Sequence, residues 1–303
     1  MAICRKFHRP DFFITFTCNP NWTEITKELR ENETVQDRPD LVARVFKLKK
    51  DQLMKDIRSE RVLGKVPAFL WLIEFQKRGL PHAHILVILT DDDRISCSAD
   101  VDNTISAQLP PDPDLFPEGS DERAQAKRLE NIVLQNMIHG PCGPSNPSSP
   151  CMVDGKCSKK FPKKFCDKTI ISADSTYPEY QRLEPSKGGR SIQIVFKGKT
   201  FEVDNRMVVP YSPFMCLKFD CHTNIELCVS PIAAKYLFNY ATKGHDRAMV
   251  RTEIADETIK DEITEYIDLR SVGSSEATWH IFSFIIAKKY PAVYALRVHL
   301  EDE

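Results

Sequence analysis

A β-hairpin is predicted by the stretch Trp71-Leu72-Ile73-Glu74-Phe75-Gln76-Lys77-Arg78-Gly79-Leu80-Pro81-His82-Ala83-His84-Ile85-Leu86-Val87-Ile88-Leu89. Two apolar runs, 68–75 and 85–89, flank a polar turn that contains glycine and proline, which is typical of two antiparallel strands within a sheet. Because side chains alternate along a strand, the two histidines of this stretch project to one face.

Glu74 is expected on the same face as His82 and His84. Pairing Glu74 with either histidine preserves the even register, whereas a slip of one residue would bring Phe75 there instead. Two imidazoles and one carboxylate leave open positions on a divalent ion, which suits a catalytic metal better than a closed structural site. The alternative is that both histidines are ordinary half-buried strand residues without a metal.

Composition indicates a soluble protein with one large core or two modest ones. The chain has 303 residues, is 42% hydrophobic and contains no apolar run near the ~18 residues that would span a bilayer. Its start resembles no signal peptide, so the ten cysteines are expected as thiols or metal ligands in a reducing compartment. The net charge of −1 gives no global argument for nucleic-acid binding, which must rest on local clusters of charge.

The order of elements predicts an α+β fold. A buried strand within 11–22 is expected beside the hairpin, and apolar spacings of three and four predict an amphipathic helix from Pro39 to Leu63, closed by Gly64. Further along we expect a helix over 122–138, a hairpin over 191–203, a strand over 221–229, packing helices around 276–284 and a strand over 293–300.

A zinc site is predicted in a segment that has few apolar residues. Eight, five and eight residues separate Cys142, Cys151, Cys157 and Cys166, and there is no C-x2-C motif, so the zinc signal is weak. A loop with so little core would gain a cross-link from four thiolates on Zn²⁺, with His139 as a substitute for one of them.

Lysines concentrate in the same segment. Six fall in thirteen residues, interleaved with Phe161 and Phe165: Lys156, Lys159, Lys160, Lys163, Lys164 and Lys168. Cations that follow phosphates and rings that stack on bases predict a surface for single-stranded nucleic acid, against the alternative of a solvated face. Lys77 and Arg78, in the turn beside the histidines, are expected to contact the same ligand.

A second helix carries a pair of tyrosines. Residues 230–244 begin with Ser230-Pro231 and end with Gly244, which predicts both helix ends. Four-residue spacing places Tyr236 and Tyr240 on one face, with Lys243 on the same side. The alternative is that both rings are ordinary core packing.

Together these groups suggest transesterification at a phosphodiester. A phenol with a pKa near ~10 is a poor nucleophile at neutral pH, so a metal must polarise the phosphate and offset its growing charge. Lys243 would add positive charge on the tyrosine side. A tyrosine–phosphate ester retains the free energy of the broken bond, so the strand can be rejoined without ATP.

These motifs, in this order, resemble the replication-initiator (Rep) domain of Helitron-type rolling-circle transposases, which are HUH endonucleases named for a His-hydrophobic-His motif. The resemblance rests on four segments within 12–300: Phe13–Pro20, Glu74–His84, Ile138–Cys142 and Tyr236–Gly244. It implies that His82 and His84 are the metal-binding pair, Glu74 the third ligand, and Tyr236 and Tyr240 the nucleophiles.

The resemblance also implies a fold and a reaction. The fold would be an RRM-like central antiparallel sheet with flanking helices, divided as 1–95 and 186–303 for the nuclease core and 96–185 for a Cys/Lys-rich insertion. The reaction would be nicking and joining of single-stranded DNA at transposon ends, with Mg²⁺ or Mn²⁺, through a covalent 5′-phosphotyrosine intermediate. A nuclear protein without membrane contact is expected.

Family members usually continue into a helicase, and this chain has no phosphate loop. Gly198-Lys199-Thr200 imitates the end of one, but position 193 is Gln where a glycine is needed. We therefore expect nicking and joining without unwinding, from a fragment or a decayed copy with intact motifs.

Two alternatives belong to other classes. The first is a non-haem metal oxygenase, since two histidines and a carboxylate also describe that iron site, although the tyrosine helix then has no role. The second is a non-catalytic, zinc-stabilised nucleic-acid-binding module or transposon remnant, in which Tyr236→Phe would change no activity.

Overall fold

The structure is a computed structural model that describes residues 2–75, 80–144, 146–172, 175–196, 198–230, 248–250, 267–269 and 272–292. Its helices are α1 (Ala2–Phe7), α2 (Thr23–Thr26), α3 (Pro39–Arg58), α4 (Ser98–Thr104), α5 (Asp121–Asn136), α6 (Pro213–Phe219) and α8 (Ser274–Ile281). Its strands are β1 (Phe12–Thr17), β2 (Ala68–Phe75), β3 (Pro81–Ile88), β4 (Met152–Val153), β5 (Lys156–Cys157), β6 (Ser191–Phe196), β7 (Lys199–Asp204), β8 (Thr223–Leu227), β9 (Ala248–Val250), β10 (Ile267–Leu269) and β11 (Ala287–Tyr290).

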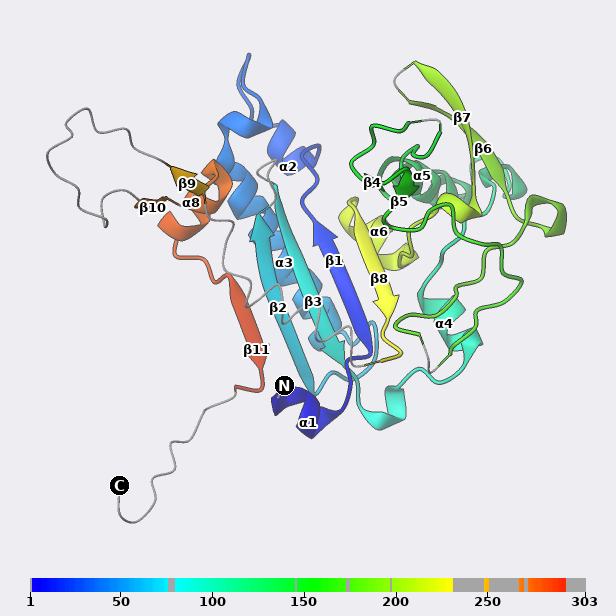
Figure 1. The fold of residues 1–303 in the computed structure, drawn as a ribbon, viewed down its shortest axis with the longest axis horizontal. Helices are drawn as coiled ribbons and strands as arrows, with labels where there is room; N and C mark the ends of the chain where they lie inside the picture. Colours follow the sequence, from blue (N-terminus) through cyan, green and yellow to red (C-terminus); the bar gives the residue numbers. More distant parts are fainter. Residues whose placement is uncertain are drawn as a thin grey trace, which may run out of the picture.

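A five-stranded sheet organises the fold. Its order is β11-β2-β3-β1-β8, and all four neighbouring pairs are antiparallel. Figure 1 shows the sheet across the centre of the molecule, with α3 behind it and a separate lobe beside β8. The prediction of an α+β fold is confirmed, and the hairpin of β2 and β3 forms as expected with β1 next to it.

The sheet has two faces of different character. Phe12, Ile14 and Phe16 of β1 are fully buried in the main core, which also contains buried residues of α3. The residues between them alternate to the other face, where Phe13 joins a small cluster with Leu72. One face therefore supplies stability, and the other is available for polar side chains.

Helix α3 covers the core face and follows the predicted apolar spacing, with Val42, Phe46 and Leu53 buried. Two details differ from the prediction. Leu48, expected on the apolar side, is 67% exposed. The helix also ends at Arg58 and not at Leu63, because the chain turns there and residue 61 adopts a positive φ before the glycine at position 64.

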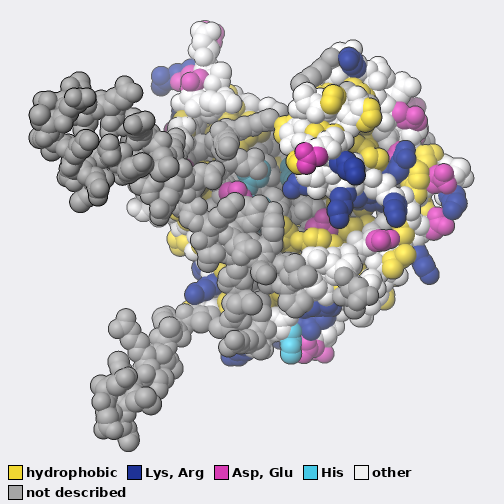
Figure 2. Space-filling model, in the orientation of Figure 1, with side chains coloured by type: hydrophobic (Ala, Val, Ile, Leu, Met, Phe, Trp, Pro, Cys, Tyr) yellow, Lys and Arg dark blue, Asp and Glu magenta, His cyan; other side chains and the backbone are white. Residues whose placement is uncertain are grey.

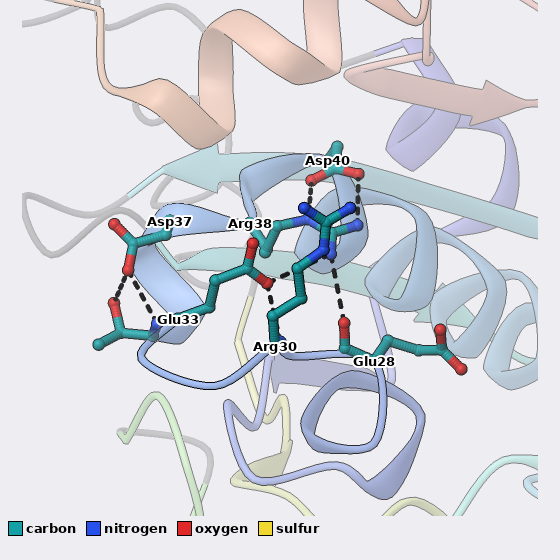
Figure 3. A network of polar contacts seen from close by, with 7 residues as sticks. Glu28, Arg30, Glu33, Asp37, Arg38 and Asp40 are labelled. Atoms are coloured by element: carbon teal, nitrogen blue, oxygen red, sulfur yellow. Dashed lines mark hydrogen bonds and ion pairs between the residues drawn. The ribbon is translucent and has the colours of Figure 1, made fainter.

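A polar network fixes the start of α3 (Figure 3). The side chain of Arg38 donates to both carboxylate oxygens of Asp40, at 3.0 and 3.1 Å, and to the carbonyl of Glu28 at 3.3 Å. One turn earlier, Thr34 and Asp37 form a capping box. These contacts hold the connection from α2 at the N-terminus of the long helix.

The outer strands of the sheet come from the second half of the chain. β8 was predicted within 221–229, whereas β11 was not, because its four residues are all exposed and show no alternation. The expected strand over 293–300 lies outside the described residues. Helix α8 precedes β11 and buries Trp279, whose ring lies 6.1 Å from that of Phe46 on α3.

A second core lies in the lobe beside β8 (Figure 1). It joins α5 to α6 through buried residues that include Val133, Tyr211 and Cys216. The Arg182 guanidinium is buried there and donates to three backbone carbonyl groups. The helix predicted over 122–138 and the hairpin predicted over 191–203 are both present in this lobe, as α5 and as β6 with β7.

The boundaries proposed at residues 95 and 185 stay a prediction. The helix predicted over 230–244 lies almost wholly outside the described residues, which stop at residue 230 and resume at 248. None of the helices in the described ranges combines the length and the apolar character needed to cross a bilayer.

Candidate active site and metal centres

The hairpin places both histidines of the opening motif on the face of the sheet that is opposite α3. His82 and His84 alternate along β3 with Ala83 and Ile85, which are fully buried in the main core. The backbone register pairs Glu74 of β2 directly with His82. The shared face expected for these three side chains follows from this register.

Among the described residues, Glu74, Thr15 and Phe13 contact His84. Its Nε2 atom lies 2.8 Å from Oε2 of Glu74, and its Nδ1 atom lies 3.2 Å from the hydroxyl of Thr15. The imidazole also stacks on Phe13, with ring centroids 5.7 Å apart. The hydroxyl and the ring together fix the orientation of this imidazole, with Nε2 toward the carboxylate.

His82 has a matching arrangement. Its Nδ1 atom lies 2.9 Å from the hydroxyl of Thr17, and the same hydroxyl lies 3.2 Å from Nδ1 of His222. Burial, together with the positive charges that His222 and His84 would carry if protonated, lowers the pKa of His82 to about 4. Burial likewise lowers the pKa of His222 to about 4. Both imidazoles are therefore neutral at pH 7, the form that binds a metal.

The two threonines and His222 were not predicted from the sequence. A signal for the threonines was present, because Thr15 and Thr17 alternate along β1 in the same way that the histidines alternate along β3. The register pairs Thr15 with His84 and Thr17 with His82. Such hydroxyl groups hold a ligand ring in one orientation, and a second partner of this kind is usual for metal-bound imidazole. His222 gave no such signal, since it precedes β8 by one residue.

The donor set suits a divalent metal, but the three side chains are not fully gathered. In an octahedral site with metal–ligand distances near ~2.1 Å, neighbouring donor atoms lie about 3 Å apart, which the His84–Glu74 pair satisfies. His82, His84 and Glu74 do not form a group with all donor atoms within 4.8 Å of one another among the described residues. A metal on all three would draw them closer.

Other predicted site residues lie outside the described residues. Tyr236, Tyr240 and Lys243 fall in the gap after residue 230, and Lys77 and Arg78 fall in the gap between 75 and 80. Their roles stay predictions.

The described residues contain one group of potential ligands that is gathered. His139, Cys142, Cys151 and Cys157, which we call the cysteine cluster, have donor atoms that all lie within 4.8 Å of one another. Nε2 of His139 is 3.4 Å from Sγ of Cys157. One imidazole and three thiols are a usual donor set for structural zinc.

Cys166 is not part of the cysteine cluster, which differs from the predicted set of four cysteines. Its thiol donates to the carbonyl of Lys168 at 2.8 Å, and its backbone pairs with Arg182. His139, which the sequence analysis named as a substitute, takes the fourth place. The spacing of the four cysteines along the chain gave no indication of which one would lie outside the cluster.

Short turns bring the cluster together. The two-residue strands β4 and β5 are joined by Asp154 and Gly155, both with positive φ, as in the tight hairpin turns that favour Asp-Gly. Cys151 precedes this hairpin and Cys157 ends it, so the turn returns one thiol to the other. The backbone N–H of His139 donates to the carbonyl of Met207 at 2.8 Å and anchors the cluster to the second core.

Local charge and burial separate the thiols of the cluster. Burial, with the neighbouring thiols of Cys151 and Cys157, raises the pKa of Cys142 to about 12. Burial also opposes ionisation of Cys157, but hydrogen bonds from the backbone N–H groups of Phe161 and Lys159 hold its pKa below the ordinary value. Burial and two nearby lysines lower the pKa of His139. Ionisation of Cys157 is thus favoured over that of Cys142, and protonation of His139 is disfavoured.

The lysines predicted to bind DNA surround this cluster. Lys159, Lys160 and Lys164 are exposed, and Lys163 is half-buried. Figure 2 shows Lys and Arg side chains gathered on the lobe that carries β4 and β5. The structure thus places these residues on one surface, and their ligand stays a prediction.

Comparison with known proteins covers the first part of the chain. No curated protein matches this chain. A family model described as "Helitron helicase-like domain at N-terminus" matches residues 1–87, which include β1, α3 and the hairpin up to its last residue, with both histidines. The resemblance found from the motifs is therefore confirmed over this segment, and residues 1–87 are similar to the Helitron helicase-like N-terminal domain.

Proposed function

We propose that this protein is a metal-dependent endonuclease and strand transferase of the HUH type, which nicks and joins single-stranded DNA in rolling-circle transposition. The observation that carries the proposal is the arrangement on one sheet face, where Thr17 and Thr15 hold Nδ1 of His82 and His84 while Nε2 of His84 faces Glu74. The match of residues 1–87 supports a transposase-related role. The sheet is the proposed RRM-like core of the enzyme.

In this proposal Mg²⁺ or Mn²⁺ would bind to His82, His84 and Glu74, with the carboxylate as the hard oxygen donor that these ions prefer. The metal would polarise the scissile phosphate and stabilise negative charge on its oxygens. The protein's own residues orient the ligands: the two threonine hydroxyls fix the rings, and burial keeps His82 neutral. Zn²⁺ is the ion proposed for the cysteine cluster.

Tyr236 or Tyr240 is the proposed nucleophile. Its phenol oxygen attacks phosphorus, a new O–P bond joins the protein to the 5′ phosphate, and the 3′ oxygen leaves. The proton that the phenol loses balances the one that the departing 3′-hydroxyl gains. Lys243 would stabilise the phenolate, and a second tyrosine would allow two strand ends to be held at once.

The remaining assignments follow from the same proposal. Residues 1–95 and 186–303 would form the nuclease core and 96–185 an insertion. The substrate would be transposon-end DNA in the nucleus, with a fused helicase as the usual partner in the family. Lys77 and Arg78 would contact the DNA backbone near the cleavage point.

The test is a covalent-adduct assay. A pool of random-sequence single-stranded oligonucleotides, labelled at the 3′ end, is incubated with the protein and Mn²⁺, because the fragment that carries the 5′ phosphate becomes attached. We expect a labelled protein band that requires Mn²⁺, with peptide mapping to Tyr236 or Tyr240. The double variant Tyr236→Phe/Tyr240→Phe should lose it, while Tyr290→Phe, which changes an exposed ring on β11, should keep it. An adduct that persists in the double variant overturns the assignment.

One observation favours a second candidate, a non-catalytic nucleic-acid-binding module. The cysteine cluster is already gathered, whereas the histidine site is not. The same assay decides between them, because a binding module retains DNA but forms no adduct with any metal. Oxygen consumption with Fe²⁺ and no nicking with Mn²⁺ would instead indicate the oxygenase.

A further inference from the structure

We infer that the cysteine cluster, when it holds Zn²⁺, positions Phe161 and the lysines beside it as a binding platform for single-stranded DNA. The ligand is taken from the proposed function, on which this inference rests. We call Phe161, Lys159, Lys160, Lys163 and Lys164 the platform.

The platform is built directly on two members of the cluster. The ring of Phe161 stacks on that of His139, with centroids 4.2 Å apart and an angle of 9° between the planes. The backbone N–H groups of Lys159 and Phe161 hydrogen-bond to the thiol of Cys157, and the N–H of Lys160 donates to the Cys157 carbonyl at 2.9 Å. A metal that fixes His139 and Cys157 therefore also fixes the ring and the backbone between them.

The charges of the platform are arranged around this ring. Nζ of Lys163 lies 4.7 Å from the centroid of Phe161 and donates to the carbonyl of Lys159 at 2.9 Å. None of the platform lysines forms an ion pair with a carboxylate in the part of the chain that the structure describes. An aromatic ring with cations beside it is an arrangement that binds single strands, since bases stack on the ring and cations follow the phosphates.

The platform also adjoins the sheet face that carries the histidines. Glu226 of β8 lies opposite Phe13 of β1, the residue whose ring stacks on His84. Burial raises the pKa of Glu226. Hydrogen bonds from Tyr180 and Asn224 oppose that rise, and so do the charges of Arg182 and Lys163. Lys163 therefore lies near this carboxyl.

The segment has little else to hold its shape. No described side chain from residue 138 to residue 168 is buried, although Val153 is a large apolar residue at 57% exposure. In a segment without a core, metal coordination contributes directly to folding. The order of the platform is therefore expected to depend on zinc, whereas the sheet has its own apolar core and is not.

The experiment measures zinc and DNA binding separately, on the full chain and without Mg²⁺ or Mn²⁺. Zinc per chain is measured by mass spectrometry. Affinity for single-stranded DNA is measured by the fluorescence anisotropy of a labelled oligo-dT of about 20 nucleotides. We expect one zinc per chain, loss of it in Cys157→Ser, and affinity at least about tenfold weaker in that variant, since each stacked base contributes about 1–3 kcal/mol. Cys166→Ser is the matched control, because its thiol lies in the same segment but outside the cluster.

A second experiment removes the ring of Phe161 while it keeps the zinc ligands, and it uses a lysine variant as the control. Phe161→Leu should retain zinc and bind oligo-dT about tenfold more weakly, whereas Lys127→Gln, which changes an exposed lysine on α5 outside the platform, should change affinity far less. If Cys157→Ser does not fold, removal of zinc from the native chain with a chelator, and its restoration, makes the same comparison. Equal affinity of the zinc-free and zinc-loaded forms overturns the inference, as does native affinity in Phe161→Leu.

The outcomes separate this inference from the proposed function. Zinc-dependent binding of oligo-dT without a tyrosine adduct overturns the nuclease assignment and leaves the platform in place. Adduct formation with zinc-independent binding does the reverse.

Discussion

The histidine site and the cysteine cluster are held in place by opposite means. His82, His84 and Glu74 stand on two paired strands whose register is fixed by eight aligned residue pairs, above a core that contains fully buried residues such as Phe12 and Ile14. The cysteine cluster stands on two-residue strands and tight turns in the segment 138–168, where no described side chain is buried. The register of the sheet thus exists before any ligand arrives, although its three donor side chains are not fully gathered. The donors of the cluster are gathered, but the order of the segment around them is expected to depend on zinc.

The protonation of the two sites differs in the same sense. Burial lowers the pKa of His82 to about 4, so a metal meets a neutral imidazole at pH 7 and displaces no proton from it. Burial raises the pKa of Cys142 to about 12, so its thiol must release a proton when zinc binds. In the proposed function the sheet would thus offer a neutral imidazole to an exchangeable metal, whereas zinc in the cluster would displace a proton from Cys142 and cross-link a segment without a core.

The largest expected effect is a loss of nicking when the histidine site is changed, with no change at the cysteine cluster. His84→Ala should lower the rate of nicking about a thousandfold, because removing a ligand of a metal that supplies several kcal/mol of transition-state stabilisation loses most of it. Zinc content should be unchanged. Initial rates of oligonucleotide nicking and zinc stoichiometry measure both, with His280→Ala, an exposed histidine on α8, as the control. Zinc loss in His84→Ala would break the separation of the sites.

The next largest effect is expected in the pH dependence of stability, which tests whether burial in the folded protein keeps His82 neutral. An unfolded histidine takes up its proton near pH 6.5, whereas in the folded sheet burial lowers the pKa of His82 to about 4. Between these values the unfolded chain binds more protons, so the free energy of unfolding of the metal-free protein should fall as the pH drops. Stability is fully present above pH 6.5, and the fall reaches about 3 kcal/mol by pH 4.

Urea unfolding of the metal-free protein at several values between pH 7 and pH 4.5 measures this fall. The difference from His82→Gln isolates the contribution of one histidine from the carboxylates that titrate nearby. Parallel curves for the two proteins would contradict the prediction and place His82 in solvent.

A smaller effect is expected from the threonine that holds two imidazoles. Thr17→Val removes the hydroxyl that contacts His82 and His222, while it retains a β-branched residue suited to the strand. Loss of such an orienting group typically weakens metal affinity or activity 10–100-fold. Thr17→Ser keeps the hydroxyl and should stay close to the native rate. Isothermal titration with Mn²⁺ and nicking rates measure it, and equal values for both variants would assign the hydroxyl no role.

The smallest effect concerns the turn that returns one cysteine to another. Gly155 has a φ of +73° and open space around it, so Gly155→Ala meets no clash and pays only for the backbone conformation. That conformation costs an L residue about 1–2 kcal/mol, which predicts zinc affinity about tenfold weaker in a competition titration. Gly140→Ala also meets open space, but φ there is not positive, so it should bind zinc normally. Equal zinc affinities of the two variants would show that the backbone conformation at Gly155 does not affect zinc binding.

The sequence predicted the parts of the molecule that follow from periodicity. Alternation along 81–88 and the even register with Glu74 sufficed to place three side chains on one face, because a sheet allows only two faces. The helix α3 followed from spacings of three and four, apart from Leu48, which is exposed because an apolar residue gives no indication of where the buried stripe ends.

Other features depended on contacts between distant segments. His222 reaches Thr17 from about two hundred residues away, and no local pattern at His222 signals that contact. The strand β11 has the composition of a solvent-exposed segment and becomes a strand only because β2 offers it an edge. The cluster contains His139 and not Cys166 because of turns with positive φ, and the spacing of the cysteines in the sequence does not predict the directions of these turns.

The sheet order has a consequence for how the chain is divided in practice. The segment 1–87 contains the three inner strands and α3, but the strands that flank them begin at residues 223 and 287. A recombinant fragment cut at residue 87 would present two bare strand edges and leave Phe46 without Trp279, which invites aggregation. The unit that sequence comparison marks is therefore shorter than the unit that folds, and expression of the histidine site calls for a chain that extends past residue 290.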